Sequence, residues 1–129
     1  FKLINELGLE PIFKLLPKTI NIATKYREVD YFCLPSFYEG TPNALCEAIA
    51  TGLPIACSNV CDNGYYVKSG ENGVLFNPCY PWDMADKIQN LISMDDVTYQ
   101  SYCASSIQIA HVKLAEDVFI NKYLEILLI

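Results

Sequence analysis

The sequence predicts an α/β fold of the Rossmann-like type, in which helices flank a parallel sheet. Residues 31–34 form an apolar run that stops at Pro35, as a buried strand does before a loop. A helix is expected to open at Thr41, a good N-cap residue, and to end at Gly52. A second apolar strand follows over residues 53–57. Strand, loop, helix and strand within about thirty residues make a βαβ unit, whose strands run parallel with a right-handed crossover.

Length and charge narrow the classes of function. The chain has 129 residues, of which 52% are hydrophobic, so it can bury one core and is not disordered. Its formal net charge of −6 argues against nucleic acid as a partner, because that partner needs clustered Lys and Arg. No apolar run approaches the roughly 20 residues of a membrane span. The chain starts at Phe1 without a leader peptide, so we expect a piece of a longer cytoplasmic protein, which could also work at the inner face of the membrane.

The six cysteines are expected to be free thiols. Cys33, Cys46 and Cys57 fall in the strands and the helix of the βαβ unit, where buried thiols of a cytosolic protein are common. No Cys-x-x-Cys pair occurs, and Cys57, Cys61 and Cys79 make a poor zinc site. The sequence therefore predicts neither a disulfide framework nor a bound metal.

Three elements are expected before this unit. Residues 1–9 are predicted to be the tail of a helix, residues 12–16 a short strand, and residues 20–28 a helix with Tyr26 on its packing face. In a doubly wound sheet of order 3-2-1-4-5-6, the strand at 31–34 would be the fourth and the strand at 12–16 the third. Two strands between them are then expected to lie outside this chain.

The second half of the chain is also predicted to alternate between strands and helices. Residues 58–64 are rich in turn formers, and a third strand is expected at 74–76. One helix is predicted to start at Pro81, and the next is predicted to be capped by Asp95. The last helix, near 114–128, has two apolar stripes, and because one core buries only one of them, the second implies another contact surface.

The start of the helix after Thr41 is the first candidate binding feature. In parallel sheets, ligands bind beyond the carboxyl ends of the strands, near helix N-termini. The free N–H groups of Asn43 and Ala44, with Thr41 just before them, would face an anion such as a phosphate, whereas Pro42 has no N–H to offer.

Two glutamates form the second candidate feature. Glu39 lies on the loop after the strand, and Glu47 lies on the helix that follows. Because charge repulsion keeps a bare carboxylate away from phosphate, we expect both side chains to bind the hydroxyl groups of a sugar or a ribose.

The residues around these glutamates resemble a known signature. They read Pro-Ser-x-x-Glu-Gly-x-Pro around Glu39 and Glu-Ala-x-Ala-x-Gly-x-Pro from Glu47 onward. This is similar to the signature of the group 1 (family 4) glycosyltransferases, which are retaining enzymes of the GT-B architecture. In that architecture two Rossmann-like domains face each other across a cleft, and the signature lies in the C-terminal domain, which holds the nucleotide-sugar donor.

The resemblance implies a role for each residue of the signature. Glu39 would be the catalytic residue, holding hydroxyl groups of the donor sugar and steadying charge near the anomeric carbon. Glu47 would accept hydrogen bonds from the ribose hydroxyls, because a carboxylate suits a vicinal diol. The other implied donor-binding residues are Gly40, which permits close backbone approach, and Thr41, Asn43 and Ala44, whose amides would face the diphosphate or the sugar.

The resemblance also implies partners and limits. Residues 1–129 would be an incomplete C-terminal nucleotide-sugar-binding domain, with the first strands and the N-terminal domain absent. The partners would be a nucleotide-diphosphate sugar, a carbohydrate or lipid-linked acceptor and the N-terminal domain, with no metal and no cofactor besides the donor. Cell-surface polysaccharide or lipopolysaccharide would be the product. The isolated chain is expected to be inactive and to self-associate through an unpaired strand edge and the second apolar stripe.

Two other functions stay open from the sequence alone. One is a GT-B relative with different chemistry, such as a nucleotide-sugar epimerase or a phosphorylase. An epimerase should carry more ionisable residues around the sugar, and a phosphorylase needs a cofactor lysine that the signature lacks. The other is a non-catalytic interaction module of the same fold. Residues 63–67 lack the glutamate that family members often place near the donor, so no donor contact is assigned to them.

Overall fold

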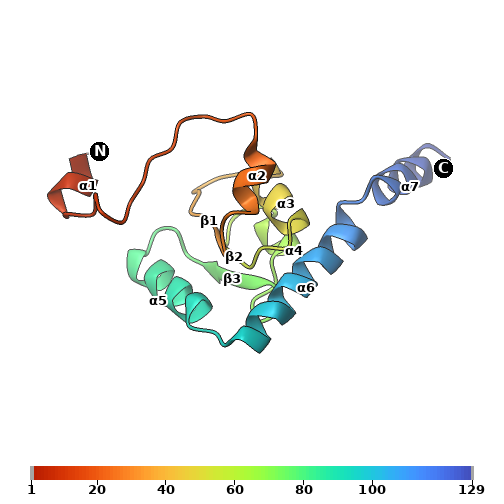
Figure 1. Cartoon of the computed structure of the whole chain (residues 1–129). Coiled ribbons are helices and arrows are strands. Elements are labelled where there is room, and N and C mark those ends of the chain that lie inside the picture. Colours follow the sequence, from red (N-terminus) through yellow and green to blue (C-terminus); the bar gives the residue numbers. More distant parts are fainter. Residues whose placement is uncertain (1, 129) are drawn as a thin grey trace.

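A computed structural model describes residues 2–128, and a parallel sheet of three strands forms its centre (Figure 1). The strands lie in chain order, with β2 between the other two. Both pairings are parallel, and Ile55 lies beside Phe32 on one side and beside Gly73 on the other. The predicted βαβ unit is therefore confirmed. The strands are β1 (Phe32–Leu34), β2 (Ile55–Ser58) and β3 (Gly73–Phe76).

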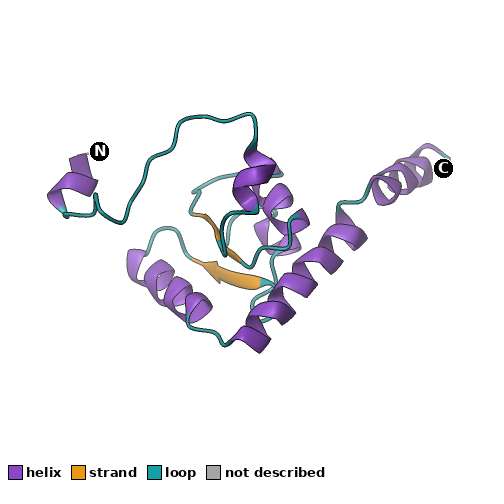
Figure 2. Ribbon diagram, in the orientation of Figure 1, coloured by secondary structure: helices purple, strands orange, loops and turns teal. Residues whose placement is uncertain are grey.

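Helices cover both faces of this sheet (Figure 2). The side chains of β2 alternate between two cores, because successive residues of a strand point to opposite faces. Ile55 and Cys57 pack in one core, whereas Ala56 packs in the other. Mixed α/β layers of this kind confirm the predicted fold class. The helices are α1 (Lys2–Glu6), α2 (Ile22–Tyr26), α3 (Asn43–Ala50), α4 (Asn63–Tyr66), α5 (Pro81–Ile92), α6 (Asp96–Lys113) and α7 (Glu116–Leu127).

The core on the first face joins α3 to the sheet and to α6. Leu45, Ala48 and Ile49 of α3 are completely buried, at the helical spacing that puts them on one side. Partly buried side chains from the second half of α6, such as Ile109, pack against this core. Burial of each large aliphatic side chain of this kind contributes about 1.5–3 kcal/mol.

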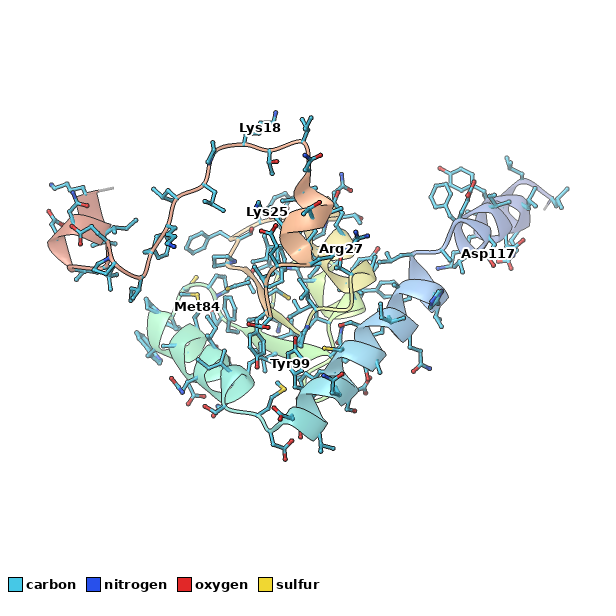
Figure 3. All side chains as sticks on the ribbon, in the orientation of Figure 1. Lys18, Lys25, Arg27, Met84, Tyr99 and Asp117 are labelled. Carbon is cyan, nitrogen blue, oxygen red and sulfur yellow. The ribbon has the colours of Figure 1, made fainter. Side chains whose placement is uncertain are left out.

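The core on the second face lies under α5. Leu91 and Phe76 are buried there, with Met84 and Ile88 of the same helix packed against them. Met84, Ile88 and Leu91, three or four positions apart, thus form the face of α5 that packs on the sheet. Met84 of α5 and Tyr99 of α6 both lie on the sheet side of their helices (Figure 3).

Local signals fix several helix ends. Asp95 caps α6, because its carboxylate accepts a hydrogen bond of 2.8 Å from the backbone N–H of Thr98. Pro81 occupies the start of α5, as predicted. Gly52, at φ +86°, follows α3 in the left-handed conformation that ends helices. The expected start of α3 is wrong by one position: Pro42 is its N-cap, and no side chain caps it.

The strand expected at residues 12–16 does not form. The N–H groups of Ile12 and Phe13 both donate to the carbonyl oxygen of Leu9, which makes a turn, and the chain then runs extended through exposed residues to α2. A strand needs a neighbouring strand for its backbone groups. Among residues 2–128 the sheet consists of β1, β2 and β3, and residues 12–16 pair with none of them. Lys18 lies on this extended connection (Figure 3).

Three further expectations need correction. The helix expected over residues 20–28 covers only α2, and the loop expected over 58–64 contains the start of α4. Cys33 is exposed rather than buried, because it sits on β1, which is an edge strand among the described residues. All six cysteines are free, as predicted.

Both ends of the described chain expose apolar side chains. Helix α7 extends away from the sheet (Figure 1), and none of its residues is buried. Ile126 and Leu127 are 70% and 73% exposed, and Ile20, in the connection before α2, is 96% exposed. Apolar surface of this extent is typical of a contact with another part of a protein or with a partner.

We expect Gly73→Ala to unfold the sheet locally. A Cβ atom at this position would lie 2.2 Å from the carbonyl oxygen of Ile55 and 2.9 Å from Cγ1 of Val67, and neither can move away cheaply. The loss in the free energy of unfolding should be on the order of 3 kcal/mol, measured by urea denaturation.

The matched control is Gly40→Ala, where a new Cβ atom meets nothing within 4 Å. The urea concentration at which half of Gly40→Ala is unfolded should stay close to that of the wild type. If Gly73→Ala and Gly40→Ala unfolded at the same urea concentration, the close approach of β2 to β3 would be contradicted.

Candidate functional site

The loop between β1 and α3, residues 35–42, lies at the carboxyl edge of the sheet and is tied to β2. The hydroxyl group of Ser58, the last residue of β2, donates to the carbonyl oxygen of Ser36 at 2.5 Å. The carbonyl oxygen of Leu34 lies 3.4 Å from the same hydroxyl. Ser58 is completely buried, so the loop is held against a part of the molecule that cannot move away.

Glu39 is positioned by this same loop. The hydroxyl group of Ser36 donates to Oε1 of Glu39 at 2.5 Å, and the side chain of Glu39 is half-buried. Within residues 2–128 the other carboxylate oxygen, Oε2, has no hydrogen-bond partner. One oxygen thus fixes the side chain, and the second is free to accept from a ligand.

The N-terminus of α3 offers unpaired backbone donors next to Glu39. The N–H groups of Leu45 and Cys46 donate to the carbonyl oxygen of Pro42. Among the described residues, the N–H groups of Asn43 and Ala44 have no acceptor. They carry the partial positive charge of the helix start, so they suit an anion.

Glu47 lies one turn further along α3. Residues 43 and 47 are four positions apart, so Asn43 and Glu47 share one exposed face of the helix, about 6 Å apart along its axis. The hydroxyl group of Tyr26, on α2, lies 3.2 Å from Oε2 of Glu47 and 3.3 Å from the carbonyl oxygen of Ala44. Oε1 has no partner within the described part of the chain.

Tyr26 is held firmly in this position. Its side chain is 6% exposed, and its ring packs edge-on against Phe32 with the ring centres 5.7 Å apart. Burial, and then the hydrogen bond to Glu47 and the charge of that carboxylate, raise the pKa of Tyr26 to about 12. The phenol therefore stays protonated at neutral pH and acts as a donor that orients Glu47.

The structure brings the predicted site residues together on one segment. Glu39, Gly40, Thr41, Asn43, Ala44 and Glu47 all lie between the end of β1 and the exposed face of α3. A ligand can approach the backbone at Gly40, because the protein leaves the space beside its Cα atom empty. Sequence reasoning missed the three residues that position the two glutamates, which are Tyr26, Ser36 and Ser58.

A second loop, from the end of β2 to α4, supports the first. Nδ2 of Asn63 donates to the carbonyl oxygen of Ser58 at 2.9 Å. Asn63 is completely buried, and its Oδ1 atom has no partner within the described chain. Cys61 has φ +47°, and it is the one non-glycine residue in the described range with a positive φ. A side chain in this conformation costs roughly 1–2 kcal/mol.

The part of the chain that the structure describes lacks two further features. Within residues 2–128, no three His, Cys, Asp or Glu side chains are grouped so that they could hold a metal ion. The same residues contain no helix that is both long and apolar enough to cross a membrane.

A comparison with protein families decides the class. The family model described as "Glycosyl transferases group 1" matches residues 2–94, which is more than half of the chain. The chain belongs to this family. The resemblance carried by the two glutamate motifs is therefore confirmed.

Two relatives of this glycosyltransferase chain indicate how much of a whole protein it represents. An uncharacterised glycosyltransferase of Haemophilus influenzae is 30% identical over 125 residues, which are 95% of this chain and 33% of the relative. A UDP-Gal:alpha-D-GlcNAc-diphosphoundecaprenol alpha-1,3-galactosyltransferase of Escherichia coli is 37% identical over 70 residues, which are 54% of this chain and 18% of the relative. The chain thus spans a third or less of the length of these relatives.

The fold of this glycosyltransferase chain also has solved counterparts. A sucrose-phosphate synthase of Thermosynechococcus elongatus superposes on it with a TM-score of 0.86 and 20% sequence identity, over 97% of this chain and 32% of that one. A sequence identity of 20% means that this comparison shows a shared fold and nothing about function. The chain therefore has the fold of part of a GT-B glycosyltransferase.

We expect the stability of the wild type to fall between pH 10 and pH 12, and Tyr26→Phe to reduce this fall. The native pKa of about 12 lies above the usual 10, so above pH 10 the unfolded state loses a proton that the native state retains. Two pKa units correspond to about 2.7 kcal/mol, so the variant should lose roughly 2 kcal/mol less over this range.

Burial is also the main reason why the pKa of Tyr99 is raised to about 12. Tyr99 therefore accounts for part of the stability that Tyr26→Phe still loses between pH 10 and pH 12. At pH 7 the free energy of unfolding of Tyr26→Phe should be about 1 kcal/mol lower than that of the wild type, because a hydrogen bond is lost. Urea unfolding at pH 7, 10 and 11.5 tests both statements, with Tyr38→Phe at an 81% exposed tyrosine as control. Identical pH profiles for wild type and Tyr26→Phe would contradict the protected phenol.

Proposed function

We propose that this chain is part of the C-terminal, nucleotide-sugar-binding domain of a retaining glycosyltransferase. One observation carries the proposal: two carboxylates, each oriented by a hydroxyl group through one oxygen, flank the unpaired amides of a helix start. A nucleotide-diphosphate sugar presents the complementary groups, which are sugar hydroxyls, a diphosphate and a ribose diol. The enzyme would transfer the sugar to an acceptor with retention at the anomeric carbon.

Glu39 is proposed as the catalytic residue. Its free oxygen can accept a hydrogen bond from a hydroxyl group of the donor sugar, and its charge can stabilise the positive charge that develops at the anomeric carbon. The bond from Ser36 keeps this carboxylate in one place, so little reorganisation is needed as the charge develops.

Glu47 is proposed to bind the ribose. A carboxylate can accept from both hydroxyls of a vicinal diol, and the hydroxyl of Tyr26 leaves Oε1 fully available. Because ribose takes no part in the reaction, this contact has the same strength in the ground state and the transition state.

The backbone between the two glutamates is proposed to bind the diphosphate. The amides of Thr41, Asn43 and Ala44 would donate to its oxygens, and the open space at Gly40 would let the donor lie against the chain. No cofactor besides the donor and no bound metal are part of the proposal.

The substrates and the place of action are proposed more broadly. The name of the E. coli relative contains a UDP-sugar and a lipid diphosphate, which supports a nucleotide sugar as donor and a carbohydrate or lipid-linked acceptor here. Synthesis of cell-surface polysaccharide or lipopolysaccharide in the cytoplasm, at the inner face of the membrane, agrees with such substrates.

The N-terminal domain is proposed as the partner of the exposed apolar surfaces. Helix α7 and the segment before α2 expose the side chains that such a domain would cover. Residues 1–129 alone should therefore self-associate at micromolar concentration, as light scattering can establish. A soluble monomer would contradict this assignment of the apolar surfaces.

We expect opposite kinetic profiles for the two glutamate variants of the full-length enzyme. Glu47→Ala should raise KM for the nucleotide sugar about 10- to 100-fold with a small effect on kcat, because each lost charge-assisted bond is worth about 1.5–3 kcal/mol. Glu39→Gln should lower kcat by about 100-fold or more while the nucleoside diphosphate still binds.

The control is Glu71→Gln, an exposed glutamate in the turn before β3, at the other edge of the sheet. It should match the wild type in KM and kcat. Wild-type turnover in Glu39→Gln, or an unchanged KM in Glu47→Ala, would refute the proposed roles.

A further inference from the structure

Within residues 2–128, the hydroxyl group of Tyr26 is the one group that holds the carboxylate of Glu47. It lies 3.2 Å from Oε2 of Glu47 and 3.3 Å from the carbonyl oxygen of Ala44. A hydroxyl group has one proton to donate, and a charged oxygen is a stronger acceptor than a neutral carbonyl oxygen. Tyr26 therefore donates to Glu47 in preference to Ala44.

The core of the protein fixes the position of this donor. Tyr26 packs in the core on the first face of the sheet, together with Leu45, Ala48 and Ile49 of α3. A ring in a close-packed core does not follow the movement of a surface side chain. Glu47 lies on the exposed face of α3, and without Tyr26 its long side chain would have only water to hold it there.

No neighbouring side chain can replace Tyr26 in this task. Glu47 and Tyr26 border a hollow of about 260 Å³ between α2 and α3. The remaining walls of the hollow are Ile22, Ala23, Ala50 and Thr51. Thr51 carries the only other hydroxyl group in these walls, and it donates to the backbone carbonyl oxygen of Glu47 at 2.8 Å. The carboxylate thus depends on Tyr26 alone.

We propose that Tyr26 is a specificity-determining residue, which makes the site select ribonucleoside over 2′-deoxyribonucleoside diphosphate sugars. Tyr26 acts through Glu47, so it is a positioning residue. The inference rests on the proposed function, because it needs Glu47 to bind the pentose of the donor. It adds to that function the class of nucleotide that the site accepts and the residue that enforces this choice.

The selection follows from the way in which the carboxylate is held. With Oε2 bound to Tyr26, Oε1 of Glu47 points in one direction, and the two neighbouring hydroxyl groups of a ribose can donate to the carboxylate. A 2′-deoxyribose lacks one of these donors, and a fixed carboxylate cannot turn to find another. A carboxylate that is free to turn would move into water instead, so the missing hydroxyl group would cost little affinity.

Titration calorimetry on the full-length protein tests the inference. The probes are UDP, GDP and ADP, each compared with its 2′-deoxy counterpart, so that the members of a pair differ in one hydroxyl group. We expect at least one of the three to bind, about fivefold or more tightly than its 2′-deoxy counterpart. Tyr26→Phe should lower this preference about threefold or more, because the carboxylate is no longer held.

Tyr99→Phe is the matched control. It removes a hydroxyl group that lies 3.3 Å from the backbone carbonyl oxygen of Asp30 and has no contact with Glu47, so it should keep the preference of the wild type. Tyr26→Phe should fold, because phenylalanine keeps the ring that packs on Phe32, and urea unfolding at pH 7 establishes this.

Variants of Glu47 separate positioning from a merely structural role. Glu47→Ala should bind the two members of a pair about equally, and adding Tyr26→Phe to Glu47→Ala should leave that ratio unchanged. If the double variant has a lower ratio than Glu47→Ala, Tyr26 does not act through Glu47, and the inference is wrong.

The remaining outcomes distinguish this inference from the proposed function. Equal affinity of the wild type for both members of a pair overturns the inference while nucleotide binding stands. The same preference in wild type and Tyr26→Phe does so too, even if the variant binds both members more weakly, because an equal loss indicates a structural role. Failure of UDP, GDP and ADP alike to bind overturns the proposed function itself.

Discussion

The buried hydroxyl group of Ser58 is the contact on which the geometry of the site depends. It joins the end of the central strand to the carbonyl oxygen of Ser36, and the side chain of Ser36 in turn holds Glu39. Asn63 binds the carbonyl oxygen of Ser58 from the other side. A loop with no regular structure is thus tied to a completely buried residue by one short hydrogen bond, and a second short bond within the loop holds Glu39. The geometry of the proposed site therefore depends on how β2 packs.

The packing of β2 explains why that residue cannot shift. All four residues of β2 are buried, and two cores receive its alternate side chains. Its partner β3 approaches so closely at Gly73 that a methyl group would overlap the backbone of Ile55. A parallel strand that is covered on both faces in this way has no freedom to slip in register.

The sequence predicted the elements whose signals are local. The apolar runs of β1 and β2, the cap at Asp95 and the helix start at Pro81 all depend on neighbouring residues, and all were found. The strand at 12–16 was not, because strand formation depends on a partner far away in the sequence. Both motif glutamates were identified from their place after a predicted strand and from the signature that the residues around them resemble, but Tyr26 was not assigned to the site. Its contact with Glu47 spans 21 positions and becomes visible only when α2 is packed against α3.

The charges around the site define what the rest of the protein has to supply. Residues 29–67 contain no Lys or Arg, but they contain Asp30, Glu39, Glu47 and Asp62. Asp30 precedes β1 and so lies at the opposite edge of the sheet, whereas Glu39, Glu47 and Asp62 follow β1 and β2, and a diphosphate at the start of α3 would meet no compensating cation among these residues. The helix start contributes about 0.3–1 kcal/mol at an exposed site toward holding a negative charge, and it is the one positive feature that these residues supply there. The proposed donor site would therefore need cations from outside residues 29–67. In a two-domain glycosyltransferase, binding of the donor would then depend on how the two domains are placed relative to each other.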